Sequence, residues 1–133
     1  MKILLLGAEG QLGKEISKTF EKLNLIQYTR ENFDLESSNI KDKIISISPN
    51  VVINCAAYTN VDLAENDKEK AYKVNSHALR DLSRATQEIN CKLVHFSTDY
   101  VFSGDSKIPY KEESATNPKT IYGKSKLEGE NFI

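Results

Sequence analysis

Short apolar runs alternate along the chain with longer segments in which apolar residues recur at helical spacing. The apolar runs predict strands at residues 3–6, 25–28, 51–53 and 93–97, and the periodic segments predict helices at residues 11–23, 40–47, 67–89 and from 120 onward. The continuous apolar run at residues 3–6 is typical of a strand buried on both faces, and the alternation of strands with helices is typical of a parallel sheet flanked by helices. The pattern therefore predicts an α/β fold of three layers, Rossmann-like, within a single domain over residues 1–133.

The helical spacing is clearest in two segments. In the first helix the repeat consists of Leu12, Ile16, Phe20 and Leu23, and in the long helix it consists of Ala71, Val74, Ala78, Leu82 and Ala85. Residues 98–118 are rich in Ser, Gly, Pro and charge and predict a loop. This loop is longer than most connections, so we expect it to be functional or mobile.

The charge balance and the lengths of the apolar runs argue against nucleic-acid-binding and membrane proteins. The chain has 133 residues, with 18 Lys and Arg against 19 Asp and Glu. This balance lacks the basic excess that duplex nucleic acid requires, and no apolar stretch has the length of a membrane span or of a secretory signal. We therefore expect a cytoplasmic protein with no nucleic-acid or membrane partner. Cys55 and Cys91 have no metal-ligand spacing, which predicts buried free thiols and no metal site.

A glycine-rich turn follows the first predicted strand. Gly7, Gly10 and Gly13 are spaced as GxxGxxG and lead directly into the first helix. Gly7 permits a sharp turn, Gly10 lets the backbone approach a pyrophosphate, and Gly13 lets the helix pack on the strand. This context favours a dinucleotide-binding turn over three glycines that serve only turning and packing.

The end of the second strand bears on the choice between the two nicotinamide cofactors. No acidic residue for an adenosine ribose stands at Tyr28-Thr29, and Arg30 follows. A guanidinium pairs well with a 2′-phosphate, which favours NADP(H) over NAD(H), while the nearby Glu31 and Asp34 leave dual use open. A solvated loop charge is the competing interpretation of Arg30.

Tyr122 and Lys126 are four residues apart at the start of the last predicted helix, so they share one face. An ammonium group near a tyrosine favours the phenolate, which suits the phenol to act as a general acid. Thr98, at the end of the fourth strand, provides a hydroxyl that could hold the same substrate oxygen. Alone, this spacing is common on helix surfaces, but the glycine turn upstream favours the catalytic interpretation.

Four blocks of sequence, at residues 7–13, 54–65, 97–102 and 122–130, resemble the extended short-chain dehydrogenase/reductase family. More narrowly, they resemble its dTDP-4-dehydrorhamnose reductases. The resemblance implies an NAD(P)H-dependent oxidoreductase that reduces the C4 ketone of dTDP-4-dehydro-L-rhamnose to give dTDP-L-rhamnose for cell-surface polysaccharide. It also implies a dTDP-sugar as the substrate and a protein that positions and polarises while the cofactor supplies the redox chemistry.

The resemblance assigns roles to particular positions. Tyr122 would protonate the C4 oxygen, Lys126 would contact the nicotinamide ribose, and Thr98 would orient the ketone. The substrate-binding residues would be Thr98, Asp99 and Tyr100. The cofactor-binding residues would be Gly7, Gly10, Gln11, Leu12, Gly13, Arg30, Ala56, Ala57, Tyr58, Asn75, Tyr122 and Lys126.

Two departures from the family leave alternatives open. Glu9 places a carboxylate beside the proposed phosphate turn, and the sequence stops at Ile133, before the last strands and the substrate-binding region that the family has. A different epimerase or dehydratase of the same family, a non-catalytic nucleotide-binding or regulatory subunit, and an inactive fragment are the alternatives. An unpaired sheet edge predicts a homodimer or aggregation of the isolated chain.

The remaining polar residues receive simpler interpretations. His77 and His95 have no ligand partner at suitable spacing, so we expect packing or surface roles for both. Asp62, Glu65 and Asp67 precede a predicted helix, and their charges complement its N-terminus.

Overall fold

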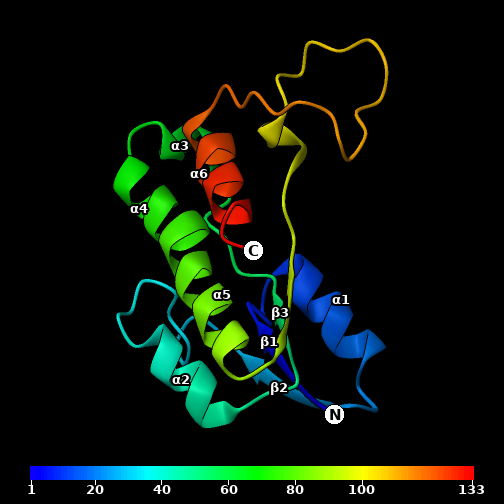
Figure 1. The fold of residues 1–133 in the computed structure, drawn as a ribbon, viewed down its shortest axis with the longest axis vertical. Coiled ribbons are helices and arrows are strands. Elements are labelled where there is room, and N and C mark those ends of the chain that lie inside the picture. Colours follow the sequence, from blue (N-terminus) through cyan, green and yellow to red (C-terminus); the bar gives the residue numbers. More distant parts are fainter.

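The computed structural model describes residues 1–133 and contains a four-stranded parallel sheet, whose first three strands lie between α1 (Gln11–Thr19) and α5 (Ala78–Glu88) in Figure 1. The strands are β1 (Lys2–Leu6), β2 (Asn24–Tyr28), β3 (Val51–Asn54) and β4 (Lys92–His95), in the order β2-β1-β3-β4. β1 and β3 occupy the middle of the sheet, and Leu4, Leu5 and Leu6 are almost fully buried. The predicted Rossmann-like fold and the four strands are confirmed, but β4 ends at His95 and not at Ser97, so Thr98 lies beyond the end of the strand.

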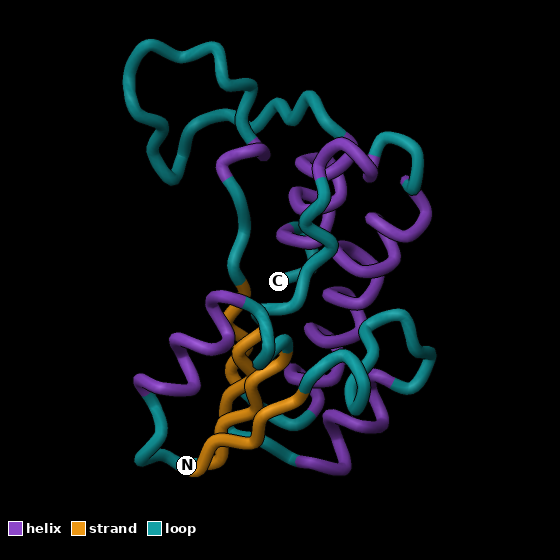
Figure 2. The backbone as a smooth tube through the Cα atoms, turned by 180° about the vertical axis from the view of Figure 1, so that it is seen from behind, coloured by secondary structure: helices purple, strands orange, loops and turns teal.

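Helices cover the two faces unequally. Helices α2 (Ile40–Ile47) and α5 (Ala78–Glu88) pack on one face, where Ile44 and Leu82 join Leu4, Leu6 and Val52 in the larger core cluster. On the other face lies α1 (Gln11–Thr19), visible in both views of the backbone (Figures 1 and 2). The sheet thus separates two apolar layers, as the continuous apolar strands predicted.

The predicted long helix is a rod with a distortion in its middle. It consists of α4 (Lys68–Tyr72), one turn of π-helix that we label η1 (Lys73–His77), and α5. Single π-helical turns are frequent at functional sites. Beside this rod lies α6 (Ile121–Glu130), and Gly129 allows close approach because a Cβ there would meet the Asn75 carbonyl oxygen and lie 3.0 Å from Leu79 Cδ2.

The start of α6 is held from two sides. The Thr120 hydroxyl accepts a hydrogen bond from the backbone nitrogen of Gly123 at 3.0 Å, as an N-cap residue does. The backbone nitrogen of Ile121 donates to Glu65 Oε1 at 2.8 Å, and Glu65 directly follows the short helix α3 (Val61–Ala64). Glu65 therefore complements the N-terminus of α6, whereas the sequence had suggested the helix that follows it in the chain.

Two predicted helix ends and the burial of two apolar residues in the first helical repeat need correction. The first helix ends at Thr19, since Phe20 caps it and a turn leads into β2, so Leu23 is 45% exposed and does not join the repeat. Leu12 is 41% exposed because it faces a cavity at the glycine turn. The last helix ends at Glu130, before Ile133.

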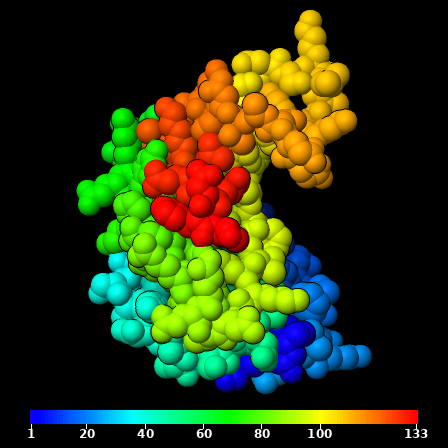
Figure 3. All heavy atoms as spheres, viewed as in Figure 1, coloured from blue at the N-terminus to red at the C-terminus, as the bar shows by residue number.

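The chain between β4 and α6 forms a protruding loop, as predicted. It begins with a turn of 3₁₀-helix, η2 (Asp99–Val101), and then extends away from the sheet. The molecular surface is hollowed between this loop and α1 (Figure 3). β4 forms one edge of the sheet, with Val94 and the following Phe96 exposed, and homodimerisation through this edge stays a prediction. None of the helices has the length and apolar character needed to cross a lipid bilayer.

Candidate cofactor and active site

The glycine turn between β1 and α1 is built by close backbone packing. Gly7 has φ +76°, and a Cβ at this position would lie 2.7 Å from the backbone nitrogen of Ala56. A Cβ on Gly13 would lie 2.8 Å from Ala8 Cα, so α1 starts directly against the turn. Gly10 has a more open surrounding, because a Cβ there would have only the Gly7 carbonyl oxygen within 4 Å. The predicted turn at Gly7 and the predicted packing at Gly13 are confirmed, whereas the approach of Gly10 to a pyrophosphate stays a prediction.

A cavity of about 570 Å³ opens at this turn, at the N-terminal end of α1. Because the first backbone N–H groups of a helix are unpaired and carry partial positive charge, this end favours an anion. Glu9 is exposed at the rim, where water screens its carboxylate. The cavity is lined by Gly7, Glu9, Gly10, Gln11, Leu12, Thr29, Arg30, Cys55, Ala56, Ala57 and Thr59.

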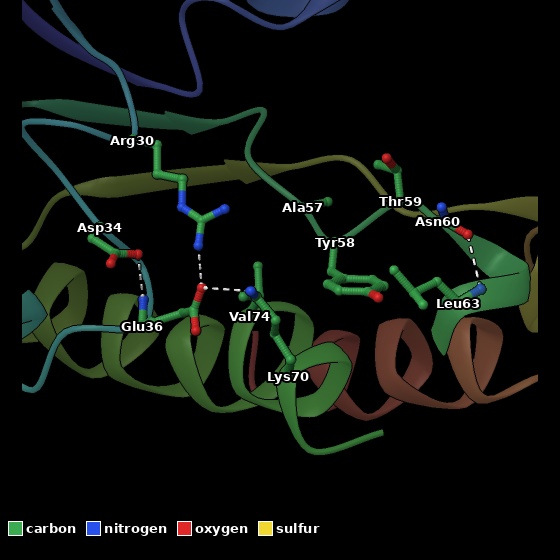
Figure 4. A pocket seen from close by; sticks show the side chains of 10 residues that line it. All are labelled: Arg30, Asp34, Glu36, Ala57, Tyr58, Thr59, Asn60, Leu63, Lys70 and Val74. Atoms are coloured by element: carbon green, nitrogen blue, oxygen red, sulfur yellow. Dashed lines mark hydrogen bonds and ion pairs between the residues drawn. The ribbon is translucent and has the colours of Figure 1, made fainter. Parts of the chain in front are cut away.

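A second cavity of about 300 Å³ lies beyond the ends of β2 and β3 (Figure 4). It shares Arg30, Ala57 and Thr59 with the first cavity, so the two cavities are contiguous and together form one groove. Figure 4 shows Arg30 reaching Glu36, which also pairs with Lys70 Nζ at 3.8 Å. The remaining lining residues are Asp34, Tyr58, Asn60, Leu63 and Val74.

The two cavities fit an extended dinucleotide. The backbone at Gly7 and Gly10 is open to a phosphate-sized group because side chains are missing there. The second cavity has an apolar wall from Leu63 and Val74 and two cations, Arg30 and Lys70, that both pair with Glu36.

Lys126 is buried on α6 and points to the end of β4. It is 2% exposed, its Nζ donates to the Phe96 carbonyl oxygen at 2.6 Å, and it lies 2.9 Å from His95 Nε2. Burial lowers the pKa of Lys126 to about 8, against a smaller opposing effect of the Glu130 charge. A lysine at this position therefore changes charge within reach of neutral pH.

Tyr122 lies one helical turn before Lys126 and meets the segment after β4. Its ring packs edge-on against the ring of Tyr100, with centroids 5.6 Å apart. Thr98 Oγ1 accepts from the backbone nitrogen of Tyr100 and donates to Asp99 Oδ1, each at 3.2 Å, which caps η2. The structure thus brings together the segment of residues 98–100 and the helix that carries Tyr122.

Residues 98–100, Tyr122 and Lys126 lie outside the groove that the two contiguous cavities form. Thr98 lines a separate cavity with Tyr110 and Glu130, while Asp99 and Tyr100 line another with Phe102 and Lys119. Tyr122 and Lys126 line neither part of the groove at the glycine turn.

Asn75 is a connector between the loop after β3 and α6. It is 2% exposed, accepts from the Tyr58 backbone nitrogen at 2.8 Å, and donates to the Tyr58 carbonyl oxygen and to Ser125 Oγ, both at 3.0 Å. It occupies the π-helical turn η1. Asn75 therefore positions Tyr58 and α6, whereas it lines neither part of the groove.

Sequence reasoning missed several polar contacts. Glu36 and Lys70 join Arg30 only in the folded chain, and their separation along the sequence gives no sign of this. His95 is not merely a packing or surface residue, because it contacts both Lys126 and Asn54. The register of parallel strands was the available signal, since Asn54 and His95 end neighbouring strands and pair directly.

The two cysteines are free and half-buried, whereas the sequence predicted full burial. Burial raises the pKa of the Cys55 thiol to about 11, although this residue borders the first cavity. A thiol with a raised pKa is a poor nucleophile at neutral pH, so Cys55 contributes wall surface to the cavity.

The parallel sheet, its order and the glycine turn between β1 and α1 define a Rossmann-like α/β domain. Within this class the chain belongs to one family: residues 1–133 match the family model described as the RmlD substrate binding domain.

Individual relatives agree with this family. The dTDP-4-dehydrorhamnose reductase of Escherichia coli is 38% identical over 139 aligned residues, which cover 100% of this chain and 46% of the relative. A crystal structure of a dTDP-4-dehydrorhamnose reductase from Clostridium acetobutylicum superposes with a TM-score of 0.96 at 43% identity, covering 99% of this chain and 48% of the other. The Bacillus anthracis dTDP-4-dehydrorhamnose reductase, crystallised with NADP, superposes at 0.93 with 38% identity over 99% and 49% of the two chains. The chain thus spans about half the length of the relatives it matches.

Proposed function

We propose that this chain is the dinucleotide-binding part of a reductase that converts dTDP-4-dehydro-L-rhamnose to dTDP-L-rhamnose. The observation that carries this proposal is the continuous groove from the glycine turn to Arg30, on the same fold as Thr98, Tyr122 and Lys126. The names of the relatives and the NADP complex of one of them support it.

In this proposal the chain's own residues bind, orient and move a proton. NADPH or NADH supplies the hydride when bound. Gly7, Gly10 and the first turn of α1 hold the pyrophosphate, and the Thr98 hydroxyl orients the substrate ketone. Tyr122 donates its phenolic proton to the ketone oxygen, and the charge of Lys126 stabilises the phenolate that remains.

We propose further that the cavity beyond β2 selects between the two cofactors in favour of NADP(H) without excluding NAD(H). Arg30 and Lys70 provide two cations for a 2′-phosphate. Glu36 pairs with both of them and reduces the positive potential that a phosphate would meet. These opposing charges support a modest preference for NADP(H) over NAD(H) and the use of both cofactors.

The first test is calorimetric titration of NADPH and NADH into the chain and into Gly10→Glu. We expect binding by the unsubstituted chain and its loss in the variant, because the new carboxylate would occupy the phosphate cradle. Lys14→Gln is the matched control, since it changes the net charge equally on an exposed site of α1 that does not line the cavity. Equal binding by Gly10→Glu would contradict the proposed cofactor site.

Glu36→Gln tests the cofactor preference. Removing this carboxylate frees Arg30 and Lys70, so the affinity ratio of NADPH to NADH should rise about two- to fivefold, the range of a partly exposed charge pair. Added salt should reduce the gain. Glu31→Gln, an exposed neighbour outside the cavity, should leave the ratio unchanged. An unchanged ratio in Glu36→Gln would mean that Glu36 does not oppose the phosphate.

A further inference from the structure

The first turn of α6, which carries Tyr122, is held by two segments that are distant in the sequence. The backbone nitrogen of Ile121 donates to Glu65 Oε1 at 2.8 Å, although the two residues are 56 positions apart. On η2, the backbone of Tyr100 lies so close to Gly123 that a Cβ at Gly123 would overlap the Tyr100 carbonyl oxygen. Tyr122 stands between these two contacts along the helix, so both act on the turn that presents its side chain.

The hydrogen bond from Ile121 has only one possible direction, because a backbone N–H only donates and a carboxylate only accepts. Ile121 is the first residue of α6, so its N–H has no partner within the helix. The capping hydroxyl of Thr120 satisfies a different group, the N–H of Gly123, and does not compete with Glu65. A hydrogen bond to an ionised acceptor is roughly twice as strong as one between neutral groups. Glu65 therefore supplies a strong, directed contact to the start of the helix.

Glu65 is in turn held by the short helix α3, which lies beside the start of α6 (Figure 1). Asn60 caps α3, since its side-chain oxygen accepts from the Leu63 backbone nitrogen at 2.8 Å (Figure 4), and Ala64 is fully buried. The backbone nitrogen of Glu65 donates to the Asp62 carbonyl oxygen at 3.3 Å and continues the turn. Asn60 and Leu63 also line the groove, so α3 connects the wall of the groove to the start of α6.

The other contacts of α6 do not include a buried apolar stripe. A helix is usually positioned by the apolar face that it buries. The buried residues of α6 are Gly123, Ser125, Lys126 and Gly129, none of which has an apolar side chain. The place of this helix therefore depends on its hydrogen bonds more than the place of a helix with an apolar face does.

We propose that Glu65 is a positioning residue: its hydrogen bond to the start of α6 sets the place of the first turn and so holds the Tyr122 hydroxyl where it reaches a substrate oxygen beside Thr98. Thr98 caps η2 through the backbone nitrogen of Tyr100, and the first turn of α6 packs on that same residue. Glu65 keeps the turn in this contact. The contribution to reduction rests on the function proposed above, whereas the placement of the turn does not.

Substitutions of Glu65 test the proposal in the longest form of the protein that carries this chain. Glu65→Ala removes the acceptor from an exposed side chain, whereas Glu65→Gln keeps an oxygen that accepts. Glu65→Ala should lower kcat by about ten- to a hundredfold, the larger value being the cost of displacing a reacting group by about 1 Å. Glu65→Gln should retain most of the activity, and the dissociation constant for NADPH should change little in both variants. Glu69→Ala, at an exposed glutamate of α4 outside the groove, is the matched control and should leave kcat unchanged.

Combination with Tyr122→Phe tests whether Glu65 acts through Tyr122. A positioning residue loses its effect once the group that it positions is gone, so adding Glu65→Ala to Tyr122→Phe should lower kcat by no more than about twofold. A merely structural role would lower kcat by the same factor in both backgrounds. That result, an unchanged kcat in Glu65→Ala alone, or a loss in Glu65→Gln as large as in Glu65→Ala would overturn the proposal.

Amide hydrogen exchange in the chain without cofactor separates this proposal from the proposed function. The Ile121 N–H should be protected in the unsubstituted chain and in Glu65→Gln, and it should exchange at least about tenfold faster in Glu65→Ala, which has lost a charge-assisted hydrogen bond. Cross-relaxation between the rings of Tyr100 and Tyr122 should weaken in the same variant. Equal exchange with and without the Glu65 carboxylate would overturn the proposal. Absence of reductase activity together with a protected Ile121 N–H would contradict the proposed function and leave the placement of the turn supported.

Discussion

Gly7→Ala is expected to lower the free energy of unfolding by about 2–5 kcal/mol, the sum of a strained backbone and an overpacked contact. The backbone at Gly7 has φ +76°, which L-residues with a Cβ rarely adopt. The added carbon would also lie 2.7 Å from the Ala56 backbone nitrogen and 2.9 Å from its Cα, neither of which is the end of a flexible side chain. Urea unfolding followed by circular dichroism measures the change.

Gly104→Ala separates these two causes. Gly104 has nearly the same backbone angle, φ +78°, but a Cβ there would have no atom within 4 Å. This variant should therefore lose only the strain contribution of about 1–2 kcal/mol. Equal losses in the two variants would show that the approach of β1 to the segment after β3 does not constrain the glycine turn.

Much of the fold could be predicted from the sequence because its central strands and one of its helices have clear local patterns. Parallel strands buried on both faces must be apolar throughout, so residues 3–6 and 51–53 mark the centre of the sheet by composition alone. Helix α2 was predicted with its observed bounds because the isoleucine repeat meets a break at Ser48 and Pro49. In the structure, Ser48 caps this helix in a left-handed conformation.

Prediction was weaker where tertiary contacts decide the outcome. The repeat of apolar residues continued to Leu23, but α1 ends at Thr19 because the chain must turn into β2. No local signal in the sequence indicated the π-helical turn η1, which carries Asn75 and its hydrogen bonds to Tyr58 and Ser125. Propensity describes a segment alone, whereas these features depend on what lies beside it.

Some features of the candidate site could likewise be predicted from local sequence patterns, whereas others depend on tertiary contacts. Glycine spacing and the step from Tyr122 to Lys126 are local patterns, so they were visible in the sequence. The charge balance around Arg30 and the partners of Lys126 come from segments that only folding brings together. Burial also gave Lys126 a lowered pKa, which no spacing rule contains.

Under the proposed function, Tyr122→Phe is expected to lower kcat for dTDP-4-dehydro-L-rhamnose reduction by about 10²–10⁴-fold, the usual contribution of a positioned general acid. The variant keeps the ring that packs edge-on against Tyr100 and removes only the hydroxyl that would donate the proton. Stability and the dissociation constant for NADPH should therefore change little. The reaction is followed by the loss of nicotinamide absorbance in the longest form of the protein that carries this chain.

Tyr72→Phe is the matched control, because it removes a tyrosine hydroxyl from α4, outside the groove and the segment of residues 98–100. It should leave kcat unchanged. A drop in Tyr122→Phe without a change in NADPH affinity would separate proton donation from cofactor binding. Full activity in Tyr122→Phe would mean that another group supplies the proton, and Lys126, held by His95 at the end of β4, would then be the first candidate.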